Sequence, residues 1–117
     1  MKSSSLWKSF QYAFRGVINS LSSERNMRIH FVAIIVVLAC GAYFHIEKQE
    51  WILLFLTMGG VVALEMMNTA VEKTVDLVTS EYRELAKQAK DIAAGAVLFF
   101  TCIAVVIGCM IFLPYIF

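Results

Sequence analysis

The sequence predicts an all-α membrane protein in which an N-terminal amphipathic surface helix precedes three transmembrane helices. Of its 117 residues, 60% are hydrophobic and only 16% are charged, and a soluble domain of this size cannot bury so much apolar surface. The single proline, Pro114, lies near the C-terminus, so long helices are allowed over almost the whole chain. We expect residues 1–117 to form one domain. The net charge of +1 gives no reason to expect a nucleic-acid partner.

The first predicted element is an amphipathic helix over residues 5–22. At about 100° per residue its large apolar side chains share one face, while basic and amide side chains and Tyr12 take the other. Aromatic residues opposite Lys and Arg are typical of a helix that lies in the membrane interface. Packing on a soluble core is the alternative, but the neighbouring segments offer little such core. The apolar face comprises Leu6, Trp7, Phe10, Phe14, Val17, Ile18 and Leu21.

Three transmembrane helices are predicted over residues 27–46, 51–79 and 87–113. The first contains an uncharged stretch over residues 31–44, and we expect Ser22 or Ser23 to cap its N-terminus. In the second, uncharged residues run only from Trp51 to Leu64, which is about 21 Å of helix. A span must cross roughly 30 Å of hydrocarbon, so this helix has to continue through the polar residues that follow.

The basic residues predict the orientation of the chain. Of the ten Lys and Arg residues, only Lys48 lies in the polar turn at 45–50. The positive-inside rule therefore places the N-terminus and the 80–91 segment in the cytoplasm. The turn at 45–50 and the C-terminus would then lie outside.

A polar stripe marks the second predicted span. Four residues spaced 3, 4 and 4 apart fall within about 80° of arc on a helix. Carboxylates inside a membrane are costly and indicate a functional site by default, whereas a packing face satisfied by partners is the weaker explanation. The stripe consists of Glu65, Asn68, Glu72 and Asp76.

The cytoplasmic ends of the other two spans bring complementary groups toward this stripe. Glu24 starts the first span, and Lys90 and Asp91 start the third. Carboxylate oxygens with one lysine suit a site for Mg²⁺ and phosphate, because magnesium takes one or two protein carboxylates and completes its shell with phosphate and water. Glu65, the deepest of the group, suits a general base acting on a buried hydroxyl. A P-loop and the glycine loop of soluble kinases are both missing from the sequence.

The run EMMNTAVEKTVDLVTSEYRELAKQAKDIAAGAVL, residues 65–98, closely resembles the bacterial integral-membrane diacylglycerol kinase family. Its pattern is E-x-x-N-[ST]-A-[IV]-E-x-x-V-D followed by a segment like A-K-D-x-x-[AS]-A-A-V. The segments ERNMRIH, residues 24–30, and IFLP, residues 111–114, look like the Gram-positive branch, whose members include undecaprenol kinases. The resemblance covers nearly the whole chain.

The resemblance implies a homotrimer in the bacterial cytoplasmic membrane, with active sites shared between subunits. By motif position, Glu65 is similar to the catalytic base, and Glu24 and Glu72 match the metal-binding carboxylates. The lipid alcohol would enter at residues 9–14 and 26–30. Around the phosphates the resemblance places Asn68, Lys90 and Asp91, and around the nucleotide Tyr12, Asp76, Glu81, Tyr82 and Arg83.

Two positions depart from the best-known diacylglycerol-specific members. His30 replaces a carboxylate, and Ser5 stands where an arginine can contact the nucleotide. His30 alone is more readily explained as an interfacial or packing histidine than as a catalyst.

The leading hypothesis is a lipid kinase that uses ATP as co-substrate and Mg²⁺ as cofactor. Undecaprenol is the first choice of membrane alcohol and diacylglycerol the second. A small proton-coupled exporter is a more remote alternative, which would make most of the polar stripe incidental and would favour four spans. A membrane-anchored interaction subunit would need no carboxylate stripe.

Overall fold

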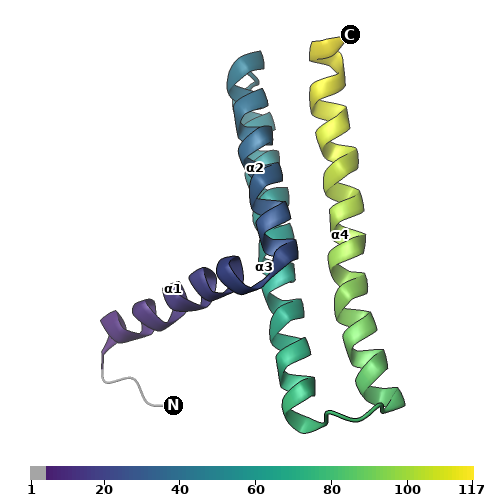
Figure 1. Ribbon diagram of the computed structural model, residues 1–117. Coiled ribbons are helices and arrows are strands. Elements are labelled where there is room, and N and C mark those ends of the chain that lie inside the picture. Colours follow the sequence, from purple (N-terminus) through teal and green to yellow (C-terminus); the bar gives the residue numbers. More distant parts are fainter. Residues whose placement is uncertain (1–4) are drawn as a thin grey trace.

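The computed structural model describes residues 5–117, which form four helices (Figure 1). The three later helices run alongside one another, and the first projects from their side at a steep angle (Figure 1). By length and composition those three are apolar enough to cross a membrane, which confirms the predicted all-helical fold with three candidate membrane spans. The helices are α1 (Leu6–Ser23), α2 (Arg25–Phe44), α3 (Lys48–Val78) and α4 (Glu84–Ile116).

The helix ends differ from the predicted ones for local reasons. α3 begins at Lys48 because Glu47 and Glu50 form a capping box, in which the Glu47 N–H donates to Glu50 Oε1 at 2.9 Å. α4 runs through Pro114 and ends two residues later at Ile116. A proline this close to a helix end removes only one backbone hydrogen bond in the final turns.

The predicted serine cap of α2 is wrong. Glu24 occupies the N-cap position of α2, without a hydrogen bond from its side chain to the helix. The hydroxyls of Ser22 and Ser23 instead donate back to the Asn19 carbonyl oxygen, at 3.2 and 2.7 Å. Both serines are therefore the last residues of α1, and their hydroxyls bond to the preceding turn of that helix, as serine side chains often do.

One end of the bundle, which we call the aromatic end, holds the hydrophobic core. Ile46, Leu54 and Ile111 are buried there, packed against partly buried neighbours that include Trp51 and Phe112. Tyr115 also donates a hydrogen bond to Glu50 Oε1 at 2.5 Å, which ties the end of α4 to the start of α3. Helix ends, aromatic rings and a hydrogen bond thus close this end of the bundle.

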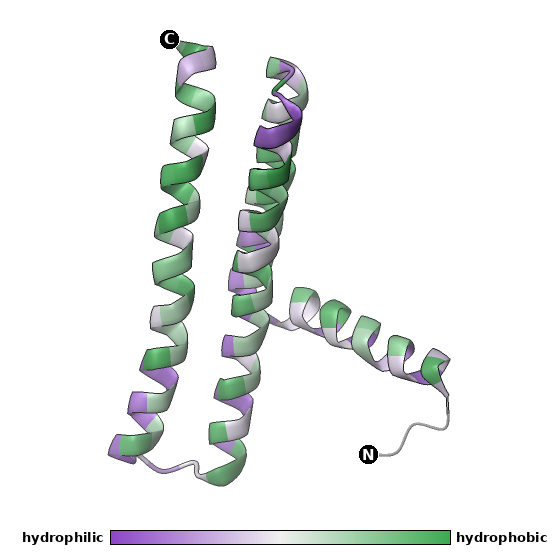
Figure 2. Cartoon of the chain, turned by 180° about the vertical axis from the view of Figure 1, so that it is seen from behind, coloured by the Kyte–Doolittle hydropathy of each residue, from purple (hydrophilic) through white to green (hydrophobic). Residues whose placement is uncertain are grey.

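At the other end, α3 and α4 continue beyond the junction of α1 with α2 before the short link at residues 79–83 joins them (Figure 1). Figure 2 shows hydrophilic residues gathered on these extended ends, whereas the middle of each long helix is mainly hydrophobic. Lys90 Nζ donates to Asp76 Oδ1 at 2.6 Å and joins the two helices. This pair is a contact between α4 and α3 near the predicted site.

Candidate active site

Glu65 lies on the face of α3 that packs inside the chain, and only 3% of the residue is exposed. Its nearest ionisable partner is His30 on α2, with 3.8 Å between His30 Nε2 and Glu65 Oε2. Among residues 5–117, no lysine or arginine forms an ion pair with Glu65. The ion pairs of Arg83, Lys87 and Lys90 are made with other carboxylates. The structure therefore buries the predicted base against a histidine.

The positions of the two predicted metal ligands along the bundle axis can be compared by counting residues from the His30–Glu65 contact. α2 and α3 are antiparallel, so moving from this contact toward the junction with α1 runs backward along α2 and forward along α3. Glu24 lies six residues from His30, about 9 Å along the axis, and Glu72 lies seven residues from Glu65, about 10 Å. The two half-buried carboxylates therefore reach about the same level of the bundle.

Within residues 5–117, no group of three or more Asp, Glu, His or Cys side chains gathers closely enough to hold a metal ion. Glu24 and Glu72 would thus provide two carboxylates at most. Such a donor set fits Mg²⁺, which usually binds one or two carboxylates together with substrate phosphates and water. It does not fit a closed metal site built from protein ligands alone.

The other stripe residues have different surroundings. Asn68 is 8% exposed, and its Oδ1 atom is buried without a hydrogen-bond partner. Asp76 pairs with Lys90, one turn beyond Glu72, so Lys90 joins the end of the stripe and not its centre. Asp91 accepts from Lys87 Nζ at 2.5 Å on the exposed side of α4. A single chain therefore does not bring Lys90 and Asp91 together around Glu72.

The predicted nucleotide residues lie in two separate places. Tyr12 is on α1, 38% exposed, with the Arg15 guanidinium 5.9 Å from its ring centre. Asp76 is on α3, and the other three lie in the link between α3 and α4, where Arg83 pairs with Glu81 at 3.8 Å and also lines a cavity of about 480 Å³. No hydrogen bond or ion pair of the described residues joins Tyr12 to this link.

The hydroxyl of Tyr82, in the link, has a shifted pKa. Its hydroxyl donates to Glu84 Oε2 at 2.8 Å. The neighbouring Glu84 carboxylate raises the pKa of Tyr82, with smaller contributions from burial and from the charge of Asp91. Tyr82 therefore stays a neutral hydrogen-bond donor in the physiological range.

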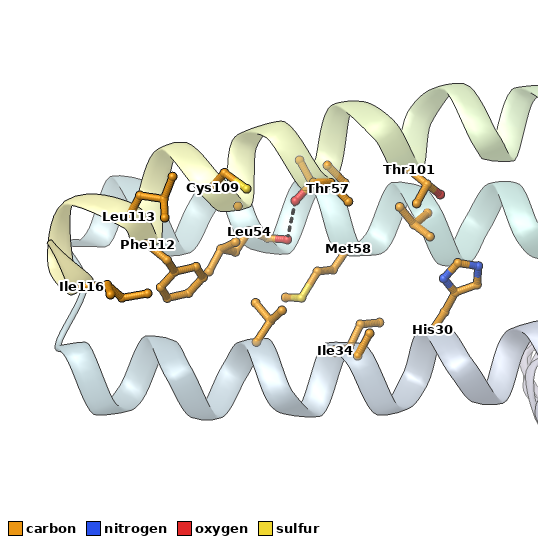
Figure 3. Close-up of a pocket in the computed structure, with 16 residues that line it drawn as sticks. His30, Ile34, Leu54, Thr57, Met58, Thr101, Cys109, Phe112, Leu113 and Ile116 are labelled. Atoms are coloured by element: carbon orange, nitrogen blue, oxygen red, sulfur yellow. Dashed lines mark hydrogen bonds between the residues drawn. The ribbon is translucent and has the colours of Figure 1, made fainter.

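An apolar groove of about 450 Å³ lies between α2, α3 and α4. Figure 3 shows His30 at one end of it and Phe112, Leu113 and Ile116 at the other. The Thr57 hydroxyl donates to the Leu53 and Leu54 carbonyl oxygens of its own helix, each at 3.0 Å. The groove thus leads from the aromatic end of the bundle to the histidine beside Glu65.

Two polar residues of this region were given no individual role in the sequence prediction, although residues 26–30 were expected at the lipid entrance. His30 was discounted as a packing histidine, and Thr101, whose Oγ1 is buried without a partner, was not considered. The chain did contain a signal for His30. His30 lies 15 residues before His45 and Glu65 lies 15 after Glu50, so a helical hairpin turning between them brings both to one level.

Comparisons with known proteins show which proteins this chain resembles in sequence. The sequence profile described as prokaryotic diacylglycerol kinase matches residues 11–112. The chain is 47% identical over 108 residues to the undecaprenol kinase of Bacillus subtilis strain 168, an alignment that covers 92% of this chain and 88% of that protein.

Two diacylglycerol kinases match over a similar part of the chain. The one from Synechocystis sp. is 43% identical over 107 residues, covering 91% of this chain and 61% of that protein. The one from Escherichia coli K12 is 29% identical over 104 residues, covering 89% and 85%. With three candidate membrane spans and a family profile that matches most of its length, the chain belongs to the prokaryotic diacylglycerol kinase family.

Proposed function

We propose that this protein is a lipid kinase that transfers the γ-phosphoryl group of ATP to a membrane alcohol, with undecaprenol as the first choice and diacylglycerol as the second. The buried carboxylate of Glu65, at the meeting point of an apolar groove and a polar stripe, is the observation that carries this proposal. A lipid alcohol has to reach its base from an apolar side, whereas ATP has to arrive from a polar one. The 47% identity to an undecaprenol kinase sets the order of the two alcohols.

In the proposed reaction Glu65 is the general base. As the lipid oxygen bonds to the γ-phosphorus, the bond from that phosphorus to the ADP oxygen breaks and the hydroxyl proton passes to the Glu65 carboxylate. Burial of Glu65 keeps competing water away from the hydroxyl. The lipid alcohol would approach along residues 9–14 and 26–30, whose second stretch ends at His30.

Glu24 and Glu72 are the residues that would hold Mg²⁺, because they supply carboxylate oxygens at one level of the bundle. The ion, when bound with ATP, supplies positive charge that offsets the charge of the phosphates. Asn68, one helical turn before Glu72 on α3, has a buried amide oxygen without a hydrogen-bond partner. Lys90 and Asp91 would lie around the phosphates, and Tyr12, Asp76, Glu81, Tyr82 and Arg83 around the nucleotide.

The proposal includes the membrane setting and the assembly. α1 would lie in the cytoplasmic interface, with Trp7, Phe10 and Phe14, each more than half exposed in the single chain, turned to lipid. The basic residues favour a cytoplasmic N-terminus and active site in a bacterial cytoplasmic membrane. We further propose a homotrimer, as the family resemblance implies. Within one chain Tyr12 and the link residues are not joined, and a neighbouring subunit would complete the site.

Mixed micelles of purified protein, labelled ATP and one lipid alcohol at matched mole fraction test the proposal. We expect label to pass to undecaprenol with a higher kcat/KM than to diacylglycerol. A preference for diacylglycerol would reverse the order of the substrates. If neither lipid acquires label, the protein is not a lipid kinase for these alcohols.

A further inference from the structure

The immediate surroundings of Glu65 offer its carboxylate few groups that could stabilise a negative charge. The residue is 3% exposed, so water provides little solvation. Thr69 directs its hydroxyl to the Glu65 carbonyl oxygen of the backbone, at 3.1 Å, and not to the carboxylate. The unpartnered atom of Asn68 is an oxygen, which cannot donate a hydrogen bond.

Burying a charged carboxylate costs free energy unless a hydrogen-bond donor or an opposite charge compensates it. A general base must be ionised before it can accept a proton. The described structure therefore needs a donor or a positive charge beside Glu65 if that residue is to act near neutral pH.

His30 is the group in position to meet this need. Its Nε2 atom is 3.8 Å from Glu65 Oε2, and its side chain is 20% exposed. On α3 the charged group that faces it is Glu65. The groove wall that α4 contributes is uncharged, with Cys109 as its titratable residue. Arg28, on the same helix, is turned to the Leu21 and Ser22 carbonyl oxygens at the end of α1.

We propose that His30 is a positioning residue that holds the Glu65 carboxylate ionised and oriented for the acceptor hydroxyl. Its role in turnover rests on the proposed function, whereas the His30–Glu65 pairing stands on the geometry alone. No proton is lost or gained by His30 in the transfer step itself, because the hydroxyl proton passes to Glu65. His30 instead sets the pH range over which Glu65 is available as a base.

The pH dependence of kcat/KM tests this role in His30→Gln, His30→Lys and a matched control. Gln keeps a polar group near the Nε2 position but cannot carry a charge, so the acid limb should move up by about one pH unit, a roughly tenfold loss on the acid side that shrinks at high pH. Lys restores a positive charge and should keep the acid limb at or below the wild-type position. His45→Asn alters the other histidine, which lies at the far end of the bundle with φ 53°, a conformation that Asn tolerates, and should match wild type.

An equal fractional loss for His30→Gln at every pH would overturn the proposal and reduce His30 to a packing residue. So would an upward shift for His30→Lys as large as that for His30→Gln.

Infrared spectroscopy of the carboxyl group reads the same pairing without turnover. The band of protonated Glu65 is assigned by its absence in Glu65→Gln and then titrated in wild type and His30→Gln. We expect it to appear at higher pH in His30→Gln, and titration at one pH in both proteins would contradict the pairing. Failure of the proposed function would show separately, as wild-type protein that phosphorylates no lipid while the infrared shift persists.

Discussion

The aromatic end of the bundle and the carboxylate region, which comprises Glu24, His30, Glu65, Asn68 and Glu72, satisfy their polar groups differently. At the aromatic end, the Glu50 carboxylate accepts from Tyr115 and from its own capping box. In the carboxylate region, Asn68 Oδ1 is buried without a hydrogen-bond partner, and the ion-pair partner of Glu65 among residues 5–117 is a histidine. Buried polar groups in proteins are usually paired, so an unpaired one calls for a specific explanation, such as a catalytic role, an ion or an ordered water.

The difference indicates a division of labour along the same helices. At the aromatic end the large side chains pack against one another. The centre of the Phe44 ring lies 6.2 Å from that of Phe112 and 5.9 Å from that of Tyr115. The carboxylate region accepts unfavourable burial of charge, which selection for stability alone would remove. Substitutions at the two ends should therefore separate activity from stability.

The largest effect is expected for Glu65→Gln. Loss of a general base lowers rates by about 10²–10⁴-fold, and kcat for lipid phosphorylation should fall by that factor while the helical circular dichroism stays unchanged. Glu50→Gln removes a carboxylate from the same helix at the aromatic end and should leave kcat near wild type. Near-normal turnover in Glu65→Gln would exclude that residue as the base.

Glu72→Gln should have the next largest effect. The loss of one of two carboxylates weakens the hold on Mg²⁺, so activity at limiting magnesium should fall by about 10²-fold and recover in part as magnesium is raised. A titration of rate against magnesium concentration measures this. An unchanged magnesium requirement would show that Glu72 does not hold the metal.

A pair of adjacent glycines tests the packing of α3 on α4. A Cβ atom at Gly60 would overlap the Phe100 ring, whereas a Cβ at Gly59 meets nothing within 4 Å. We expect Gly60→Ala to be less stable than Gly59→Ala by about 1–3 kcal/mol, the usual cost of overpacking. Denaturant titration of both variants, followed by circular dichroism, gives the difference, and equal stabilities would contradict the packing of Phe100 over Gly60.

The smallest effect is expected for Tyr115→Phe. The substitution removes the hydroxyl that donates to Glu50 but keeps the ring beside Phe44. The Tm should fall slightly, because exposed hydrogen bonds contribute little, and kcat should not change. A loss of activity without a loss of Tm would show that the aromatic end takes part in the chemistry.

Much of the fold could be predicted, because charge-free runs and polar turns are local properties of the sequence. The helix ends were less predictable, since they depend on specific hydrogen bonds such as the Glu47–Glu50 capping box. Ile46 was predicted to lie in a polar turn, yet it is buried, because His45 adopts a left-handed conformation and the chain folds back beside Gly41.

The candidate site was predicted most directly where its residues share one helix. Glu65, Asn68 and Glu72 follow from helical periodicity on α3. The pairing of Lys90 with Asp76 required the register of α4 against α3, which the link sets and the sequence pattern does not contain. His30 has no companion on its own helix, so its contact with Glu65 follows from the packing of α2 against α3 and from the equal distance of both residues from the turn.

The central claim is that the carboxylate region transfers phosphate to a membrane alcohol. Its most direct test follows ADP release and labelled lipid in parallel, with purified wild-type protein, undecaprenol micelles and labelled ATP. We predict one phosphorylated undecaprenol for each ADP, and neither product from Glu65→Gln. ADP release without labelled lipid, or labelled lipid formed equally well by Glu65→Gln, would contradict the account.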